Sequence, residues 1–153
     1  MNTFLIVTII LLAIILVLMW FIGVLIKALN DLNIHNGKYK RNFYILYEWL
    51  NKKRSNANFI LNELEKNEIS SVAIYGYHYL GLQLYKELLQ SDIEVKCFID
   101  RRKVHVNSGV PIITENNLPD VDAVIVTAIS DFLVIKERLV GKCKMVVSLE
   151  DLI

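Results

Sequence analysis

The first apolar stretch of the chain is one long run near the N-terminus. Residues 4–26 are interrupted only by Thr8 and Gly23, and Lys27 is the first charged residue of the chain. A helix of this length would extend about 34 Å, which is enough to cross a bilayer. A cleaved signal peptide is the competing interpretation, but no basic residue precedes the run and the run is longer than usual for such a peptide. We therefore predict a transmembrane anchor over residues 1–27.

The pattern then becomes polar and afterwards amphipathic, over residues 28–68. Residues 28–41 are polar, contain Asn-Gly at 36–37, and indicate a connector. Between residues 42 and 54 the apolar side chains recur at helical spacing, and a second short helix is expected over 59–66. The first of these helices could lie on the membrane surface or pack against the domain that follows. The apolar face that its spacing indicates consists of Phe43, Leu46, Tyr47 and Leu50, and Tyr44 and Trp49 widen it.

From residue 69 to residue 153, short apolar runs alternate with helical patterns. Strands are predicted at 72–75, 94–99, 109–113, 122–127 and 145–147, and helices at 79–89 and 131–139, the latter with Ser130 as its N-cap. Strands that alternate with helices imply right-handed crossovers and a parallel sheet. We therefore predict an α/β fold with flanking helices and about five strands in the order 3-2-1-4-5, which is half of a doubly wound nucleotide-binding fold.

A glycine-containing turn follows the first predicted strand. A dinucleotide-binding turn has the pattern Gly-x-Gly-x-x-Gly, whose second glycine lets a pyrophosphate approach the backbone. Gly76 and Gly81 occupy the first and third positions, and His78 occupies the second. An imidazole at this position obstructs the usual approach, although it could also donate a hydrogen bond to a phosphate. We predict a nucleotide-type site here, with the histidine as its departure from the common pattern.

Polar residues at the ends of two other predicted strands complete this candidate site. Asp100 ends the second strand, where an acidic residue commonly binds ribose hydroxyls. Arg101 follows it, together with the basic pair at 102–103, and could meet a ribose phosphate or stack on a base. Thr127 ends the fourth strand and should border the same crevice. Each of these positions also fits an ordinary strand end or a solvated loop.

The charge distribution indicates which partners to expect. Residues 27–60 contain seven basic and two acidic residues, whereas residues 61–153 contain ten basic and fourteen acidic ones. A basic segment beside an acidic domain suggests contact with anionic lipid and argues against nucleic acid. Because all basic residues follow the anchor, the positive-inside rule predicts a single-pass protein of the cell membrane whose C-terminal domain faces the cytoplasm.

No arrangement typical of catalysis is present. The sequence has no Tyr-x-x-x-Lys pair of the dehydrogenase type, no Ser–His–Asp order and no acidic cluster for a metal. The two cysteines, Cys97 and Cys143, lie in or beside apolar runs and lack metal-site spacing, which favours buried inert thiols. We therefore predict no catalytic residue and no metal site, and we expect no enzymatic activity from this chain alone.

Several segments together resemble a known family. These are an aromatic helix with Tyr44, Tyr47, Trp49 and Leu50 after a membrane segment, followed by VAIYGYHYLGLQLYKEL, VKCFIDRR, GVPIIT and VDAVIVTAI, all within residues 42–152. They resemble the Rossmann-like nucleotide-binding domains of bacterial polysaccharide-biosynthesis proteins. Such domains precede the catalytic domain of membrane nucleotide-sugar dehydratases, and they also occur in polyprenyl glycosylphosphotransferases and as short stand-alone proteins.

The resemblance implies a non-catalytic or regulatory module that binds NAD(P) or a nucleotide-sugar in the synthesis of capsule or other surface polysaccharide. Its expected partners are membrane lipid, a polysaccharide-biosynthesis enzyme and further copies of itself. Two alternatives stay open. The chain could be a fragment or subunit of a nucleotide-sugar dehydratase, epimerase or glycosylphosphotransferase, or it could be a membrane scaffold that binds no ligand.

Overall fold

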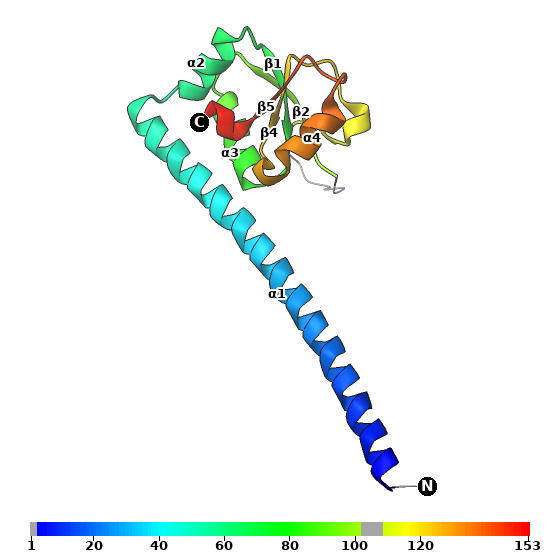
Figure 1. Ribbon diagram of the computed structural model, residues 1–153. Coiled ribbons are helices and arrows are strands. Elements are labelled where there is room, and N and C mark those ends of the chain that lie inside the picture. The colour runs from blue at the N-terminus through cyan, green and yellow to red at the C-terminus, as the bar shows by residue number, and fades with distance from the viewer. Residues whose placement is uncertain (1–2, 102–108) are drawn as a thin grey trace. The chain divides into compact units, whose positions relative to one another are not determined.

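The computed structural model describes residues 3–101 and 109–153, which form two compact units, Met1–Lys40 and Arg41–Ile153. Helix α1, Thr3–Ser55, is unbroken along its length (Figure 1). By length and composition it could cross a membrane, and the most apolar part of the helix contains no buried residue. The connector expected at 28–41 is part of this helix. One glycine costs a helix only about 1 kcal/mol, and no proline stops α1 at residues 36–37.

The last turns of α1 belong to the second unit and pack into its core. Ile45 and Trp49 are 2% and 1% exposed, and the indole Nε1 of Trp49 donates a hydrogen bond to Glu87 Oε2 at 3.2 Å. Lys53 Nζ donates to the same carboxylate oxygen at 2.9 Å. Of the two placements left open for this segment, the structure has the helix on the domain. Only part of the face that the spacing indicated packs, since Leu46 and the flanking Trp49 contact the core whereas Phe43 stays exposed.

The sheet has five parallel strands in the order β3-β2-β1-β4-β5, which confirms the predicted fold and topology. Its order reverses between β1 and β4, since the chain first adds strands on one side of β1 and then on the other. The strands are β1 Ser71–Tyr75, β2 Glu94–Ile99, β3 Ile112–Ile113, β4 Ala123–Val126 and β5 Met145–Ser148.

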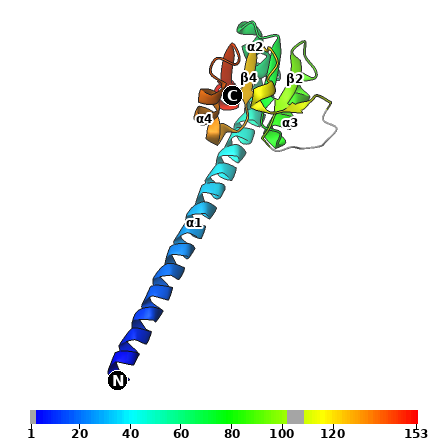
Figure 2. The same ribbon diagram turned by 90° about the vertical axis from the view of Figure 1, so that its right-hand side faces the viewer.

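The two faces of the sheet carry separate cores. Alternate residues of each central strand point to opposite faces, so Ile74 joins the core that contains α3, whereas Tyr75 joins the core that contains α4. Figure 2 shows these two helices on different sides of the strands. The central strands are buried on both faces, as their continuous apolar runs predicted.

Helices α2, α3 and α4 of the second unit lie close to their predicted positions, whereas α5 was not predicted. The helices are α2 Phe59–Lys66, α3 Tyr79–Leu88, α4 Phe132–Leu139 and α5 Leu149–Leu152, with short 3₁₀ turns at Glu115–Asn117 and Ile129–Asp131. Ser130 does not cap α4 as predicted. It lies inside the second 3₁₀ turn, which places Asp131 at the N-cap position. The tail beyond β5 is helical because the Ser148 hydroxyl accepts a hydrogen bond from the Glu150 amide at 3.3 Å.

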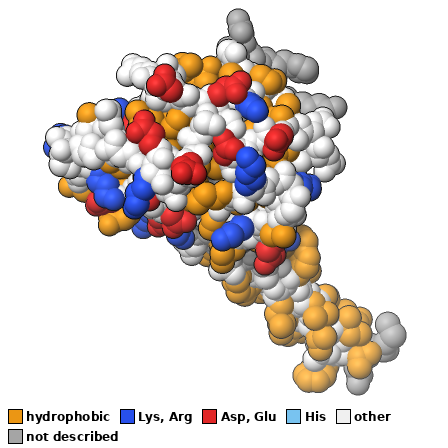
Figure 3. Space-filling view, turned by 90° about the horizontal axis from the view of Figure 1, so that it is seen from above, with side chains coloured by type: hydrophobic (Ala, Val, Ile, Leu, Met, Phe, Trp, Pro, Cys, Tyr) orange, Lys and Arg blue, Asp and Glu red, His pale blue; other side chains and the backbone are white. Residues whose placement is uncertain are grey.

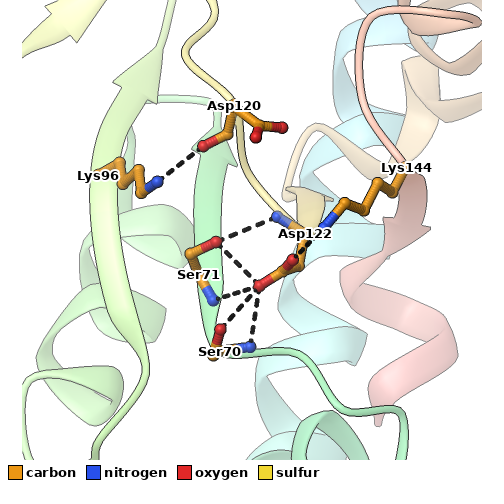
Figure 4. Close-up of polar contacts among 6 residues, drawn as sticks. All are labelled: Ser70, Ser71, Lys96, Asp120, Asp122 and Lys144. Carbon is orange, nitrogen blue, oxygen red and sulfur yellow. Dashed lines mark hydrogen bonds and ion pairs between the residues drawn. The ribbon is translucent and has the colours of Figure 1, made fainter.

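One carboxylate fastens the starts of β1 and β4 together (Figure 4). Asp122 Oδ2 accepts hydrogen bonds from the backbone amides and the hydroxyls of Ser70 and Ser71, all between 2.9 and 3.2 Å. Its Oδ1 accepts from Lys144 Nζ at 2.8 Å. These donors hold the pKa of the Asp122 carboxyl well below its usual range, with the Lys144 bond as the largest cause, and the same contact raises the pKa of Lys144.

The surface of the second unit carries both signs of charge. Figure 3 shows acidic and basic side chains interspersed over the face that it views.

Replacing Trp49 by Ala should destabilise the second unit by about 3–5 kcal/mol, because it removes a buried aromatic side chain. Tyr44→Ala is the matched control on the same helix. Tyr44 is exposed, so its loss should change stability by no more than about 0.5 kcal/mol. Amide hydrogen exchange of β1 and β4 in the full chain measures both values. Equal effects of the two substitutions would show that this segment is not part of the folded unit.

The Asp122 carboxyl should make stability depend on acid pH. Because its pKa is depressed in the folded state, its contribution is present above the unfolded value of about 3.9 and is lost as the pH falls below it. The stability difference between the wild type and Asp122→Asn should therefore be constant near neutral pH and shrink below about pH 4. Denaturant unfolding at several pH values measures it. A difference that is unchanged at pH 2–3 would contradict this assignment.

Candidate functional site

A cleft of about 460 Å³ lies at the carboxyl ends of β1 and β4, where the strand order reverses. In open α/β sheets this is the place where ligands bind. The turn after β1, the end of β2 and helix α4 supply its walls. The lining residues are Tyr75, Gly76, His78, Asp100, Arg101, Ala128, Asp131, Val134, Ile135 and Arg138.

The structure therefore brings four of the six predicted site residues to one cleft. Gly76, His78, Asp100 and Arg101 line it directly. Gly81 and Thr127 do not line it, and both lie behind the turn against Gly76. The predicted basic pair at 102–103 lies outside the described residues.

Gly76 makes the sharp turn that ends β1. Its φ of +110° is a conformation that L side chains rarely adopt, and a Cβ there would lie 2.7 Å from Thr127 Oγ1. Its amide donates to the Ile99 carbonyl at 2.8 Å, which continues the ladder between β1 and β2 beyond the last strand residue. Only glycine fits this position without strain.

Gly81 allows α3 to approach the turn closely. A Cβ on Gly81 would lie 2.2 Å from the carbonyl oxygen of Gly76, which is a backbone atom that no side-chain rotation can remove. This is the packing role that the third glycine of a dinucleotide turn performs. The spacing of Gly76 and Gly81 thus has its structural reason within the fold.

The ring of His78 lies against Gly76. Its Nε2 is 2.9 Å from the position that a Gly76 Cβ would occupy, and 3.2 Å from Thr127 Oγ1. The Thr127 hydroxyl donates to the Tyr75 carbonyl at 2.8 Å. When its one hydrogen is donated there, the same hydroxyl oxygen can accept from Nε2–H in the histidine tautomer that carries its proton on Nε2. The imidazole therefore occupies the space that a glycine at this position would leave open above the turn.

Asp100 contacts the turn itself. Its Oδ2 accepts a hydrogen bond from the Tyr77 amide at 2.9 Å, across 23 residues of sequence. The carboxylate thus holds the turn after β1 to the end of β2, and it is half-buried. In a dinucleotide site the equivalent acid is available to ribose hydroxyls, whereas here one of its oxygens already binds backbone.

A cluster that the sequence did not reveal forms one wall of the cleft. The Tyr75 hydroxyl donates to Glu115 Oε1, and Arg138 Nη2 lies 3.2 Å from that hydroxyl and 3.4 Å from the same carboxylate oxygen. Burial, followed by the neighbouring Glu115 carboxylate, raises the pKa of Tyr75 to about 12. No single motif could predict this cluster, because its members come from a strand, a 3₁₀ turn and a helix.

Two guanidinium groups give the cleft its donors. Arg101 Nε lies 3.7 Å from Glu115 Oε1, but the Arg101 side chain is 65% exposed and can reorient. Arg138 is mostly covered, and its Nε is buried with no hydrogen-bond partner among the described residues. Planar guanidinium groups suit phosphate and carboxylate ligands. Three carboxylates, Asp100, Asp131 and Glu115, lie in or beside the same cleft and limit its net positive charge.

Neither of the two thiols lines the cleft. Cys97 is 1% exposed, and burial raises its pKa to about 11. Burial likewise raises the pKa of Cys143. A thiol that stays protonated is a poor nucleophile and a poor metal ligand. Over residues 3–101 and 109–153, no group of three or more His, Cys, Asp or Glu side chains could hold a metal ion.

The chain matches no family model, no curated protein and no solved structure.

Substituting Gly81 by Ala should destabilise the second unit by about 1–3 kcal/mol, because α3 must move away from the turn to make room. Gly37→Ala is the control. Nothing lies within 4 Å of a Cβ at Gly37, so alanine there should favour the helix by about 1 kcal/mol. Thermal unfolding of the full chain, followed by amide exchange of α3, measures the effect. A Gly81→Ala variant as stable as the wild type would contradict the close approach.

Proposed function

We propose that this chain is a membrane-anchored, non-catalytic or regulatory module that binds a nucleotide or nucleotide-sugar in cell-surface polysaccharide biosynthesis. The observation that carries the proposal is the cleft at the point where the strand order reverses. It gathers Gly76, His78, Asp100 and Arg101 at the carboxyl ends of parallel strands, which is where nucleotides bind in folds of this class.

The ligand class follows from the donors around the cleft. The turn after β1 leads into the N-terminus of α3, whose first amides favour an anion. The guanidinium of Arg101 is exposed enough to reach a phosphate, and Arg138 also lines the cleft, with its buried Nε lacking a hydrogen-bond partner within the described part of the chain. NAD(P) and nucleotide-sugars both carry a diphosphate, a ribose and a base. These parts match a site with an anion-binding turn, an acid and an arginine.

The place of the protein in the cell rests on α1 and on sequence resemblance. The apolar part of α1 is long enough to cross a bilayer, and the basic residues that follow it favour a cytoplasmic C-terminal unit. The role in polysaccharide biosynthesis rests on the resemblance of the segments around Gly76, Asp100 and Thr127 to domains of that class. On this proposal a catalytic domain that acts on the ligand belongs to a partner enzyme.

A second candidate function is a membrane scaffold without a ligand, and two contacts favour it. The His78 ring covers the backbone of Gly76, and Asp100 already accepts a hydrogen bond from the Tyr77 amide. A turn whose polar groups bind one another has less to offer a nucleotide. The two functions differ in one measurable property, which is whether the cleft gains affinity when the histidine is removed.

His78→Gly should increase nucleotide affinity by about tenfold or more, or about 1.4 kcal/mol, because it restores the open approach to the turn. Titration calorimetry of the full chain in nanodiscs, with NAD, NADP and UDP-sugars at up to millimolar concentration, measures it. His35→Gly is the matched control, since His35 is exposed on α1 and far along the chain from the turn.

Binding that Arg101→Ala weakens would support the nucleotide site. If neither the wild type nor His78→Gly binds any of these ligands, the nucleotide proposal fails and the scaffold remains.

A further inference from the structure

Helix α1 carries an apolar stripe that continues well past the membrane segment. Beyond Lys27 the stripe recurs at intervals of three and four residues, which is the heptad spacing of a coiled coil. We call it the α1 seam. Its members are Leu29, Leu32, Asn36, Tyr39, Phe43 and Leu50, with Leu46 completing the repeat.

Within the second unit, the domain leaves part of this seam uncovered. Phe43 is 72% exposed, and Leu50 is also exposed. The domain packs against a different face of the helix, through Ile45 and Trp49. Of the seam residues only Leu46 is partly buried against the core. Such a row of large apolar side chains in water is costly to leave exposed.

The membrane cannot cover the seam either if α1 crosses it. The helix is unbroken from Thr3 to Ser55, and Lys27 is the first charged residue after its apolar part. At about 1.5 Å per residue, Phe43 lies roughly 24 Å along the helix from Lys27. Lipid is therefore out of reach for most of the seam, and another protein helix is the occupant that fits its shape.

We propose that a second copy of this chain covers the seam, forming a parallel, in-register two-stranded coiled coil over residues 29–50. Asn36 is the observation that selects this partner. It is the one polar member of the seam and occupies the position equivalent to Leu29, Phe43 and Leu50 in the repeat. A polar Asn at a single such position specifies register and a two-stranded state at some cost in stability.

The pairing of Asn36 with itself explains the choice of orientation. In a parallel, in-register pair each Asn36 amide faces its copy, and an amide can both donate and accept a hydrogen bond. An antiparallel or shifted pair would bury the amide against an apolar side chain, which is costly. The flanking positions of the repeat around Asn36 include His35 and Lys40 but no acidic residue, so interhelical salt bridges do not set the orientation.

Anchoring favours the same arrangement. Two copies inserted with the same topology are already parallel and at equal depth, so the in-register pair costs little further ordering. The inference rests on the membrane-spanning part of the proposed function, and it is independent of the ligand. A dimer of this kind would carry two copies of the cleft on one anchored stalk.

Disulfide crosslinking of the full chain in its native membrane tests the pair. In a background with Cys97→Ala and Cys143→Ser, single cysteines are introduced at seam positions as Leu32→Cys, Asn36→Cys and Tyr39→Cys. Ile34→Cys and Gly37→Cys are the controls, since both lie on the opposite side of the helix from the seam. A disulfide requires the two Cα atoms to be about 4.4–6.8 Å apart.

The seam positions should crosslink at least tenfold faster than the control positions. Equal crosslinking at all five positions, a maximum at Ile34, or no crosslinking at the seam would overturn the proposal. Crosslinking of this pattern in a chain that alkaline carbonate extracts from the membrane would support the coiled coil and refute the anchor. The experiment therefore distinguishes a failure of the coiled-coil proposal from a failure of the membrane anchor.

The oligomer size tests the role of Asn36. The full chain in detergent should have a protein mass of two copies by light scattering. Asn36→Leu should add trimers or larger species, whereas the control Asn30→Leu, on the outer side of the helix, should stay dimeric. A monomeric wild type at micromolar concentration, or the same change in both variants, would overturn the proposed role of Asn36.

Discussion

The close approach of α3 to the end of β1 is the constraint on which the candidate site depends. Gly81 has no room for even one added carbon atom, because the carbonyl oxygen of Gly76 would lie 2.2 Å from it. This approach fixes where α3 begins and therefore where its first amides lie. The carboxyl ends of β1 and β4 then form a cleft, since the chain leaves them on opposite faces of the sheet. The two glycines are thus explained by packing, with or without a ligand.

The same turn is also unusually well connected to its surroundings. Asp100 holds the Tyr77 amide, and Thr127 links the Tyr75 carbonyl to the His78 ring. Asp100 lies where an acid binds the ribose in a dinucleotide site, and one of its oxygens already has a partner within the fold. A ligand at this turn would have to compete with the His78 ring, which lies against the backbone of Gly76. Removing the imidazole exposes the backbone of Gly76 without disturbing the packing of Gly81.

Helix α1 has three different environments along and around its length. Its first part is apolar on all sides, as a helix in lipid must be. Its last turns bury Ile45 and Trp49 in the domain core. Beside the buried face lies the α1 seam, in which Phe43 and Leu50 are exposed. One helix therefore carries the features of an anchor, a core element and an association surface, and the spacing of its apolar residues differs in each.

Sequence alone determined the long apolar helix near the N-terminus, the five parallel strands and their order, because continuous apolar runs and strand–helix alternation are local patterns with few topological solutions. It also placed Gly76, His78, Asp100 and Arg101 at one cleft, since the carboxyl ends of parallel strands share one edge. Only the tertiary structure decided which face of α1 packs, because both faces are apolar and periodicity cannot rank them. It alone assembled Tyr75, Glu115 and Arg138, whose contact depends on how a helix and a loop pack on the sheet rather than on their spacing along the chain.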